Sequence, residues 1–124
     1  MSSKVVLDFC EIEIYDYHMI TIVNEGETIK AEHNQVLEDI ARDVYKGKPF
    51  YYITHRKYSY AVDPTVYKET SKIDNLKAFV VVTNEKIGSA FTKVEEIFLD
   101  KPLKVFDNLE LALAWVKHDH EKKR

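Results

Sequence analysis

Seven residues in the middle of the chain have the chemistry of a small-ligand site. They combine a forked cation, an imidazole, hydroxyl groups and a carboxylate, and they are His55, Arg56, Tyr58, Ser59, Tyr60, Asp63 and Thr65. An arginine such as Arg56 binds carboxylate or phosphate through two parallel N–H groups, and an imidazole such as His55 changes its charge near neutral pH. The tyrosine rings add flat apolar faces with a polar tip. The segment therefore predicts binding of a small anion or another small ligand.

The same segment admits two other interpretations. In the first, Tyr58 and Tyr60 pack over the edge of a sheet while the neighbouring basic residues are only solvated. In the second, His55, Ser59 and Asp63 form a catalytic group, although their spacing alone does not establish a nucleophile–base pair. The chain contains no G-x-S-x-G, P-loop, G-x-G-x-x-G or H-E-x-x-H motif. We therefore expect a non-enzymatic protein without a cofactor, and catalysis is kept as an alternative.

The end of the chain contains residues that could ligate a metal ion. His118, Asp119 and His120 are adjacent, but ligands in a polar chain end lack the supporting hydrogen bonds that orient a metal site. The sequence favours a solvated tail over residues 118–124 and no metal site. Cys10 is the single cysteine, so no internal disulfide can form, and its position on an alternating apolar face indicates a small core residue.

Charge is distributed unevenly along the 124 residues. Residues 1–45 carry ten acidic and three basic residues, a net −7, and residues 46–124 carry eleven acidic and fifteen basic residues, a net +4. Basic and aromatic residues are interleaved between residues 46 and 62, as in proteins that stack single-stranded nucleic acid. The overall charge of −3 and the acidic first third argue against a nucleic-acid partner.

The apolar residues are spread in short runs. No run approaches the roughly 20 residues that span a bilayer, so we expect no membrane span. The N-terminal residues lack the long apolar core of a signal peptide. We therefore expect a cytoplasmic protein.

Five segments have the pattern of β-strands. The first segment alternates apolar and polar residues, and the second follows directly after it. Together they predict a β-hairpin. The later ones are short and apolar or aromatic, which is typical of strands covered on both faces. The predicted strands are residues 5–15, 18–23, 50–54, 76–83 and 103–106.

Four segments have apolar residues at helical spacing. Gly47 is placed to end the first of them, and Asp63 followed by Pro64 is a favourable start for the second. Asp107 and Glu110 resemble a capping box at the start of the last. The predicted helices are residues 31–45, 63–71, 87–98 and 107–117.

The order β-β-α-β-α-β-α-β-α predicts a single α/β domain over residues 1–117. Its sheet has five strands and is mostly parallel, with an antiparallel first strand at an edge. In such sheets ligands bind beyond the carboxyl ends of the strands. Residues 55–62 are predicted to form a loop at such an end, just before the helix that begins at Asp63. The free N–H groups of that helix attract anions, so we expect the seven candidates to meet there.

The element order and the C-terminal residues together resemble the STAS-like domains. These domains include anti-sigma-factor antagonists, the cytoplasmic domains of sulfate transporters and a looser bacterial set related in shape to lipid-binding CRAL-TRIO domains. The segment KPLKVFDNLELALAWVK is similar to the last strand and helix of the looser set, and the residues that carry the similarity are Val105, Phe106, Glu110, Ala112, Ala114 and Trp115. The resemblance implies a non-enzymatic regulatory or binding module.

One motif of the regulatory STAS proteins is altered here. Those proteins carry D-S-S-G, with a phosphorylated first serine, at the place where this chain reads Asp63-Pro64-Thr65-Val66. Asp63 matches, but Pro64 stands at the phosphoacceptor position and has no hydroxyl group. The resemblance therefore does not extend to that phosphorylation.

Three functions follow as expectations. The first is a regulatory or binding module that acts through a protein partner or a small anionic ligand. The second is a carrier of an apolar or amphipathic small molecule held between the helices and the sheet, and the third is an enzyme that uses His55, Ser59 and Asp63. The exposed edge strand could also support a homodimer.

Overall fold

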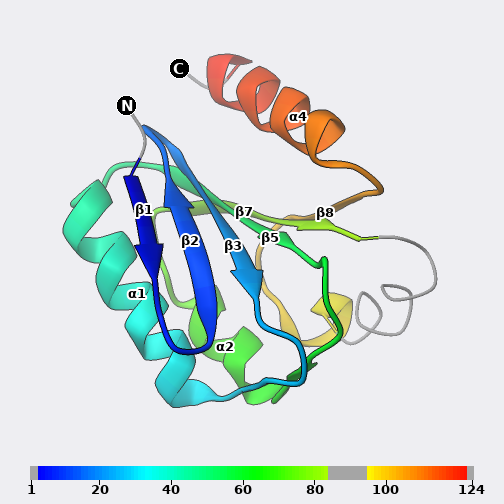
Figure 1. Cartoon of the computed structure of the whole chain (residues 1–124). Helices are drawn as coiled ribbons and strands as arrows, with labels where there is room; N and C mark the ends of the chain where they lie inside the picture. Colours follow the sequence, from blue (N-terminus) through cyan, green and yellow to red (C-terminus); the bar gives the residue numbers. More distant parts are fainter. Residues whose placement is uncertain (1–2, 84–94, 123–124) are drawn as a thin grey trace.

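The chain folds into layers, with one mixed sheet and helices on both of its faces (Figure 1). This computed structural model describes residues 3–83 and 95–122. The α/β class predicted from the succession of strands and helices is confirmed. The strands are β1 (Ser3–Val6), β2 (Cys10–Ile14), β3 (His18–Val23), β4 (Thr28–Ile29), β5 (Phe50–His55), β6 (Ala61–Val62), β7 (Leu76–Val82) and β8 (Leu103–Phe106).

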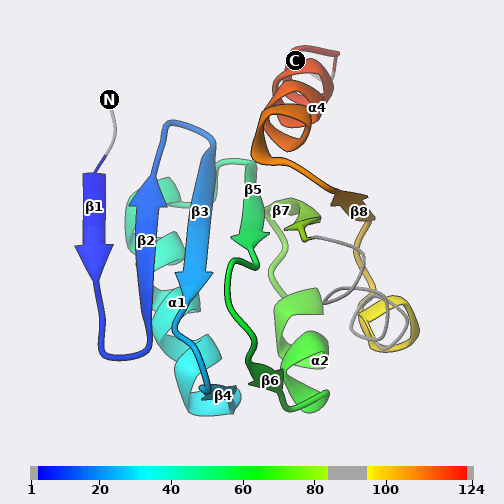
Figure 2. The same ribbon diagram turned by 45° about the vertical axis from the view of Figure 1, so that its right-hand side comes forward.

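Within the described residues, the main sheet has six strands in the order β1-β2-β3-β5-β7-β8, not the five that were predicted. β1, β2 and β3 are antiparallel neighbours, as the predicted hairpin requires, and β3, β5, β7 and β8 are parallel. β4 and β6 form a separate short ladder. Figure 2 shows this ladder beyond the ends of the main-sheet strands, beside the two helices that cover one face.

The sixth strand arises because the predicted strand of residues 5–15 is broken. The chain turns at residues 7–9, where the N–H of Leu7 donates to the carbonyl of Cys10 at 2.8 Å. The side chain of Asn24 holds the turn by donating to the carbonyl of Asp8 at 3.0 Å. Leu7 and Phe9 both pack on the core, so the alternation of apolar residues continues through the turn. The alternating pattern therefore did not reveal that the strand is broken there.

Two helices cover one face of the sheet. α1 (Ala31–Tyr45) has the bounds that its apolar stripe predicted, and α2 (Thr65–Ser71) ends where predicted. α1 ends with two left-handed residues, Lys46 at φ 50° and Gly47 at φ 86°, and glycine adopts this conformation at little cost. The N–H of Lys46 donates to the carbonyl of Arg42 at 3.0 Å and closes the last turn.

The opposite face is covered by α4 (Leu109–Lys122). Its cap is Asn108, whose side-chain oxygen accepts from the N–H of Leu111 at 2.9 Å, and not Asp107 as the capping-box pattern suggested. The helix continues to Lys122, so a polar tail beginning at residue 118 is wrong for residues 118–122. Two contacts described below hold this last turn against the sheet.

The predicted helix at residues 87–98 falls largely outside the described residues. Residues 95–98 are helical. None of the helices in residues 3–83 and 95–122 is long and apolar enough to cross a membrane.

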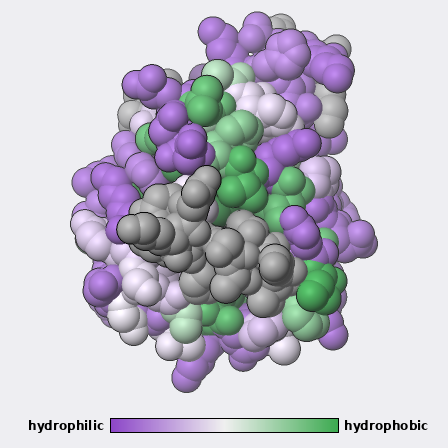
Figure 3. Space-filling model, turned by 90° about the vertical axis from the view of Figure 1, so that its right-hand side faces the viewer, coloured by the Kyte–Doolittle hydropathy of each residue, from purple (hydrophilic) through white to green (hydrophobic). Residues whose placement is uncertain are grey.

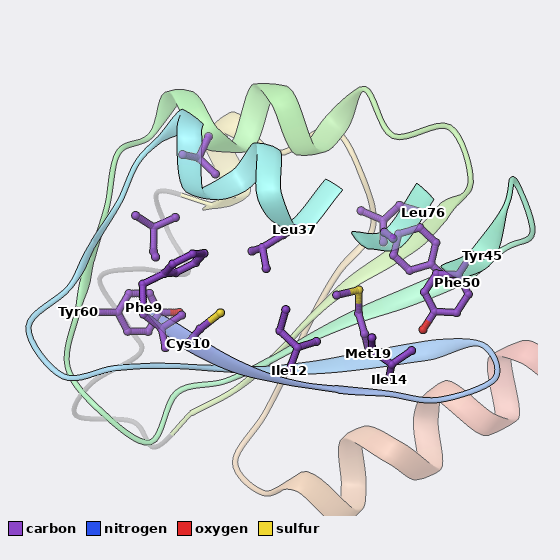
Figure 4. Packing of buried hydrophobic residues seen from close by; sticks show 14 residues of the cluster. Phe9, Cys10, Ile12, Ile14, Met19, Leu37, Tyr45, Phe50, Tyr60 and Leu76 are labelled. Carbon is purple, nitrogen blue, oxygen red and sulfur yellow. The ribbon is translucent and has the colours of Figure 1, made fainter. Parts of the chain in front are cut away.

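The layer between the sheet and α1 and α2 holds the largest group of buried apolar side chains (Figure 4). Figure 4 shows Leu37 of α1 facing Ile12 across this layer, with Tyr45 and Phe50 at one end and Tyr60 at the other. Cys10 is fully buried in the same group, which confirms it as a core residue. Burial raises the pKa of its thiol to about 12.

Candidate functional site

The segment after β5 lies at the carboxyl end of the parallel strands. β3, β5 and β7 run in one direction and end next to one another at this edge. His55 is the last residue of β5 and β6 begins at Ala61, so the predicted loop of residues 55–62 is reduced to residues 56–60. The pairing of β6 with β4 holds the end of this loop beside the start of α1.

Arg56 points into the interior and forms a buried ion pair with Glu95. Its terminal nitrogens donate to both carboxylate oxygens, Nη1 to Oε1 at 2.9 Å and Nη2 to Oε2 at 2.6 Å. Only 4% of Arg56 and 0% of Glu95 is exposed. The Nε of Arg56 donates to the Tyr60 hydroxyl at 3.1 Å, and that hydroxyl lies 3.1 Å from the hydroxyl of Thr54. A carboxylate of the chain itself therefore occupies the fork that the sequence offers to an anion.

Four of the other candidates lie at the surface. Tyr58 is 48% exposed, and the backbone N–H of Ser59 donates to the Glu25 carboxylate at 2.7 Å. Asp63 accepts hydrogen bonds from the N–H and the hydroxyl of Thr65 at 3.0 and 2.9 Å. These two bonds lower the pKa of Asp63. Asp63 and Thr65 therefore stabilise the start of α2.

His55 points to the other face of the sheet from Arg56, because successive residues of a strand alternate in direction. Burial lowers the pKa of His55, and the charge of Lys57 lowers it further. In the described part of the chain, no hydrogen bond joins His55, Ser59 and Asp63. The structure therefore brings Arg56 and Tyr60 together and leaves the other five candidates outside their cluster.

A cavity of about 60 Å³ adjoins the Arg56 cluster, between the sheet and the helices α1 and α2. Most of its wall is apolar, and its polar groups include Thr54, Arg56, Tyr60 and Tyr67. Tyr52, on the central strand β5, keeps more accessible surface than its buried neighbours in that strand, as expected of a residue that borders a cavity. The cavity therefore joins a mostly apolar wall to a group of hydrogen-bonding side chains.

The Tyr67 hydroxyl is a further polar group at this cavity. Tyr67 lines the cavity and is 2% exposed. Burial raises its pKa, and the charge of Glu95 and the interaction of the hydroxyl with the Glu95 carboxylate raise it further. The hydroxyl therefore lies beside the Arg56–Glu95 ion pair at the edge of the cavity.

A wider hollow of about 360 Å³ lies between the C-terminal ends of α1 and α2. It shares Glu38, Ala41, Phe50 and Ile73 with the wall of the cavity, so the two spaces adjoin. Burial raises the pKa of Glu38, and the nearby charge of Glu69 also raises it.

A group of aromatic and acidic side chains on the opposite face was missed by the sequence reasoning. The Tyr51 hydroxyl donates to Asp119 at 2.5 Å, and the ring of His120 stacks on Tyr17 with centroids 3.7 Å apart. These contacts order residues that the sequence placed in a solvated tail. The signal was the helical spacing itself, because residues 119 and 120 are three and four positions after the buried Val116.

His18 stands beside this group and makes stability depend on pH. Burial lowers its pKa below the ordinary 6.5, against an opposing effect of Asp16. At a pH between these two values, His18 binds a proton in the unfolded chain but not in the folded chain. The free energy of unfolding therefore falls as the pH is lowered through 6.5. In denaturant titrations at pH 7, 6 and 5, we expect His18→Gln to lose less stability on acidification than the unmodified protein.

The exposed His118 of α4 supplies the matched control for that experiment. His118→Gln leaves His18 buried, so the loss of stability on acidification that His18 causes should remain in this variant. Equal slopes for His18→Gln and His118→Gln would show that burial of His18 is not the cause.

Large apolar side chains are exposed on β8, on α4 and in residues 95–98. They are Ile97, Phe98, Val105 and Leu111. β8 is one edge of the main sheet, and Figure 3 shows apolar and polar side chains mixed on this side of the molecule. The protein partner and the homodimer stay predictions.

Comparisons of the chain with protein-family models, with curated proteins and with solved structures found no match. The resemblance to STAS-like domains therefore stays a prediction.

Proposed function

We propose that the protein is a non-enzymatic binding module for a small amphipathic molecule. The molecule occupies the cavity between the sheet and helices α1 and α2, with its apolar part against the apolar wall and its polar part at Arg56, Tyr60 and Tyr67. This is the carrier function that was an alternative at the level of the sequence. The observation that carries it is the cavity itself, whose mostly apolar wall also includes the polar side chains of Arg56, Tyr60 and Tyr67.

The absence of enzymatic activity belongs to the same proposal. Its support is that the hydroxyl of Ser59, the imidazole of His55 and the carboxylate of Asp63 make no hydrogen bond to one another in the described residues. Asp63 is engaged with Thr65 at the start of α2.

Native mass spectrometry of the purified protein tests for a molecule that is retained from the expression host. 1-Hexanol is larger than the 60 Å³ cavity, so its chain must extend into the adjoining hollow of about 360 Å³. Titration of the stripped protein with 1-hexanol, followed by NMR, then tests these two spaces together. We expect the largest chemical-shift changes at Tyr52, Val66 and Tyr67, all of which line the cavity.

Ala41→Met fills the cavity from α1 and should abolish hexanol binding while the fold is kept, because Ala41 is buried in the cavity wall. Ala114→Met, at an exposed position of α4, is the matched control and should bind hexanol as the unmodified protein does. Two results would contradict the proposal: no binding of hexanol by the unmodified protein, or equal binding by both variants. In either case the cavity holds only water.

A further inference from the structure

We propose that the bound molecule ends in a protonated amine, which lies in the hollow between α1 and α2 and is bound there by the carboxylate of Glu38. This inference rests on the proposed function, because it names the group at the second end of the molecule that the cavity takes. The polar group at the first end is uncharged, because Glu95 already neutralises Arg56. The chemical class of the ligand is therefore an amino alcohol.

Glu38 lies where the cavity meets the hollow, since it lines both spaces. A molecule with a chain of six carbons is larger than the 60 Å³ cavity, so its second end extends past Glu38 into the 360 Å³ hollow. The cavity wall is mostly apolar, but the hollow is lined by charged and amide side chains that include Arg42, Glu69, Lys72 and Asn75. A methyl group fits poorly among these side chains, and a charged group fits well.

A series of hydrogen bonds between α1 and α2 holds the Glu38 carboxylate in place. The Thr70 hydroxyl donates to Oδ1 of Asn34 at 3.2 Å, and Nδ2 of Asn34 donates to Oε1 of Glu38 at 2.9 Å. Asn34 and Thr70 are buried and line the cavity themselves. Oε2 of Glu38 accepts no hydrogen bond from any described residue. This oxygen can therefore accept one from a donor in the hollow.

The charges around Glu38 favour a cation over an anion. The carboxylate of Glu69 repels that of Glu38, and Arg42 only partly offsets this repulsion. Arg42 is engaged with Asp39 at 2.9 Å. Lys72 is engaged with Glu69 at 3.2 Å. In the part of the protein that the structure describes, no lysine or arginine forms an ion pair with Glu38. An ammonium group supplies the missing positive charge.

An amine also fits this position better than a metal ion does. Among residues 3–83 and 95–122, no three histidine, cysteine, aspartate or glutamate residues come together in a way that could hold a metal ion. An ammonium group needs only acceptors for its hydrogen bonds, and the Glu38 carboxylate is one.

The experiment compares 6-amino-1-hexanol with 1-hexanol by calorimetry at pH 7, because the two compounds have the same carbon chain and hydroxyl group. The unmodified protein should bind the amino alcohol about tenfold more tightly, since hydrogen bonds between charged groups are the stronger ones. Glu38→Gln keeps an acceptor for Asn34 but removes the charge, so it should lose this preference and still bind 1-hexanol. Glu32→Gln, at an exposed position in the first turn of α1, should keep the preference.

Two further compounds test the charge of the second group. Both 1,6-hexanediol and 6-hydroxyhexanoate should bind more weakly than 6-amino-1-hexanol. If either binds as tightly, if 6-amino-1-hexanol binds no better than 1-hexanol, or if Glu38→Gln keeps the preference, the amine site is wrong while the cavity function stands. If none of the compounds binds, both the amine site and the proposed function are wrong.

Discussion

Replacement of Arg56 by methionine is expected to lower the free energy of unfolding by about 3–5 kcal/mol. The change removes the cation that neutralises Glu95 while the Glu95 carboxylate stays fully buried. It also removes the donor to Tyr60. Urea unfolding followed by circular dichroism measures the loss.

Lys72→Met is the matched control for this prediction. Lys72 also faces a carboxylate, that of Glu69 at 3.2 Å, but both side chains are largely exposed. Surface pairs of this kind contribute about 0–1 kcal/mol, so the control should unfold almost as the unmodified protein does. Equal losses for Arg56→Met and Lys72→Met would show that the buried pair has no special role in the fold.

The double variant Arg56→Met with Glu95→Leu tests whether Arg56→Met loses stability because the Glu95 charge is left unpaired. We expect it to recover most of the stability that Arg56→Met loses, because an apolar pair leaves no buried charge. Such recovery would mean that the ion pair is not required for folding.

Val116→Asp is expected to cost about 3 kcal/mol or more, because it places a carboxylate in the apolar layer between α4 and the sheet. Val116 and Ala112 are buried there against residues of β5 and β7. The variant should either release α4 or unfold. Urea unfolding and limited proteolysis of residues 107–122 distinguish these two results.

Leu111→Asp makes the same chemical change on the exposed side of α4. Leu111 is 51% exposed and lies in the first turn, where an acidic side chain interacts favourably with the helix dipole. Its effect should stay within about 0.5 kcal/mol. If Val116→Asp and Leu111→Asp lower the free energy of unfolding equally, the packing of α4 on this face of the sheet does not stabilise the protein.

Much of the fold could be read from the sequence wherever a periodic pattern was long. α1 has its predicted bounds because a stripe of apolar residues at helical spacing extends over its length, and β8 has its predicted bounds as well. The predicted bounds are wrong where a few local hydrogen bonds determine where an element begins or ends. The turn at residues 7–9 depends on the backbone hydrogen bond of Leu7 and on the side chain of Asn24. The start of α4 depends on which of two neighbouring side chains, Asp107 or Asn108, accepts from the helix.

The candidate site was only partly predictable. Parallel strands place their carboxyl ends at one edge, so the position of the segment after β5 followed from the order of the elements. The inward direction of Arg56 could also be predicted from the sequence, since Tyr52, Thr54 and Arg56 continue one alternating face. The pairing of Arg56 with Glu95 could not be predicted, because it joins residues 39 positions apart.

What the sequence determined by itself is therefore the class of the fold, the main elements and the edge at which the candidate residues emerge. These depend on periodicity, capping and the order of strands and helices, which are local properties of the chain. The tertiary structure alone decided that Arg56 is buried, that Glu95 neutralises it, and that a cavity ends at the Tyr67 hydroxyl. Those features depend on how distant elements pack against one another, and no local pattern encodes the space that is left between them.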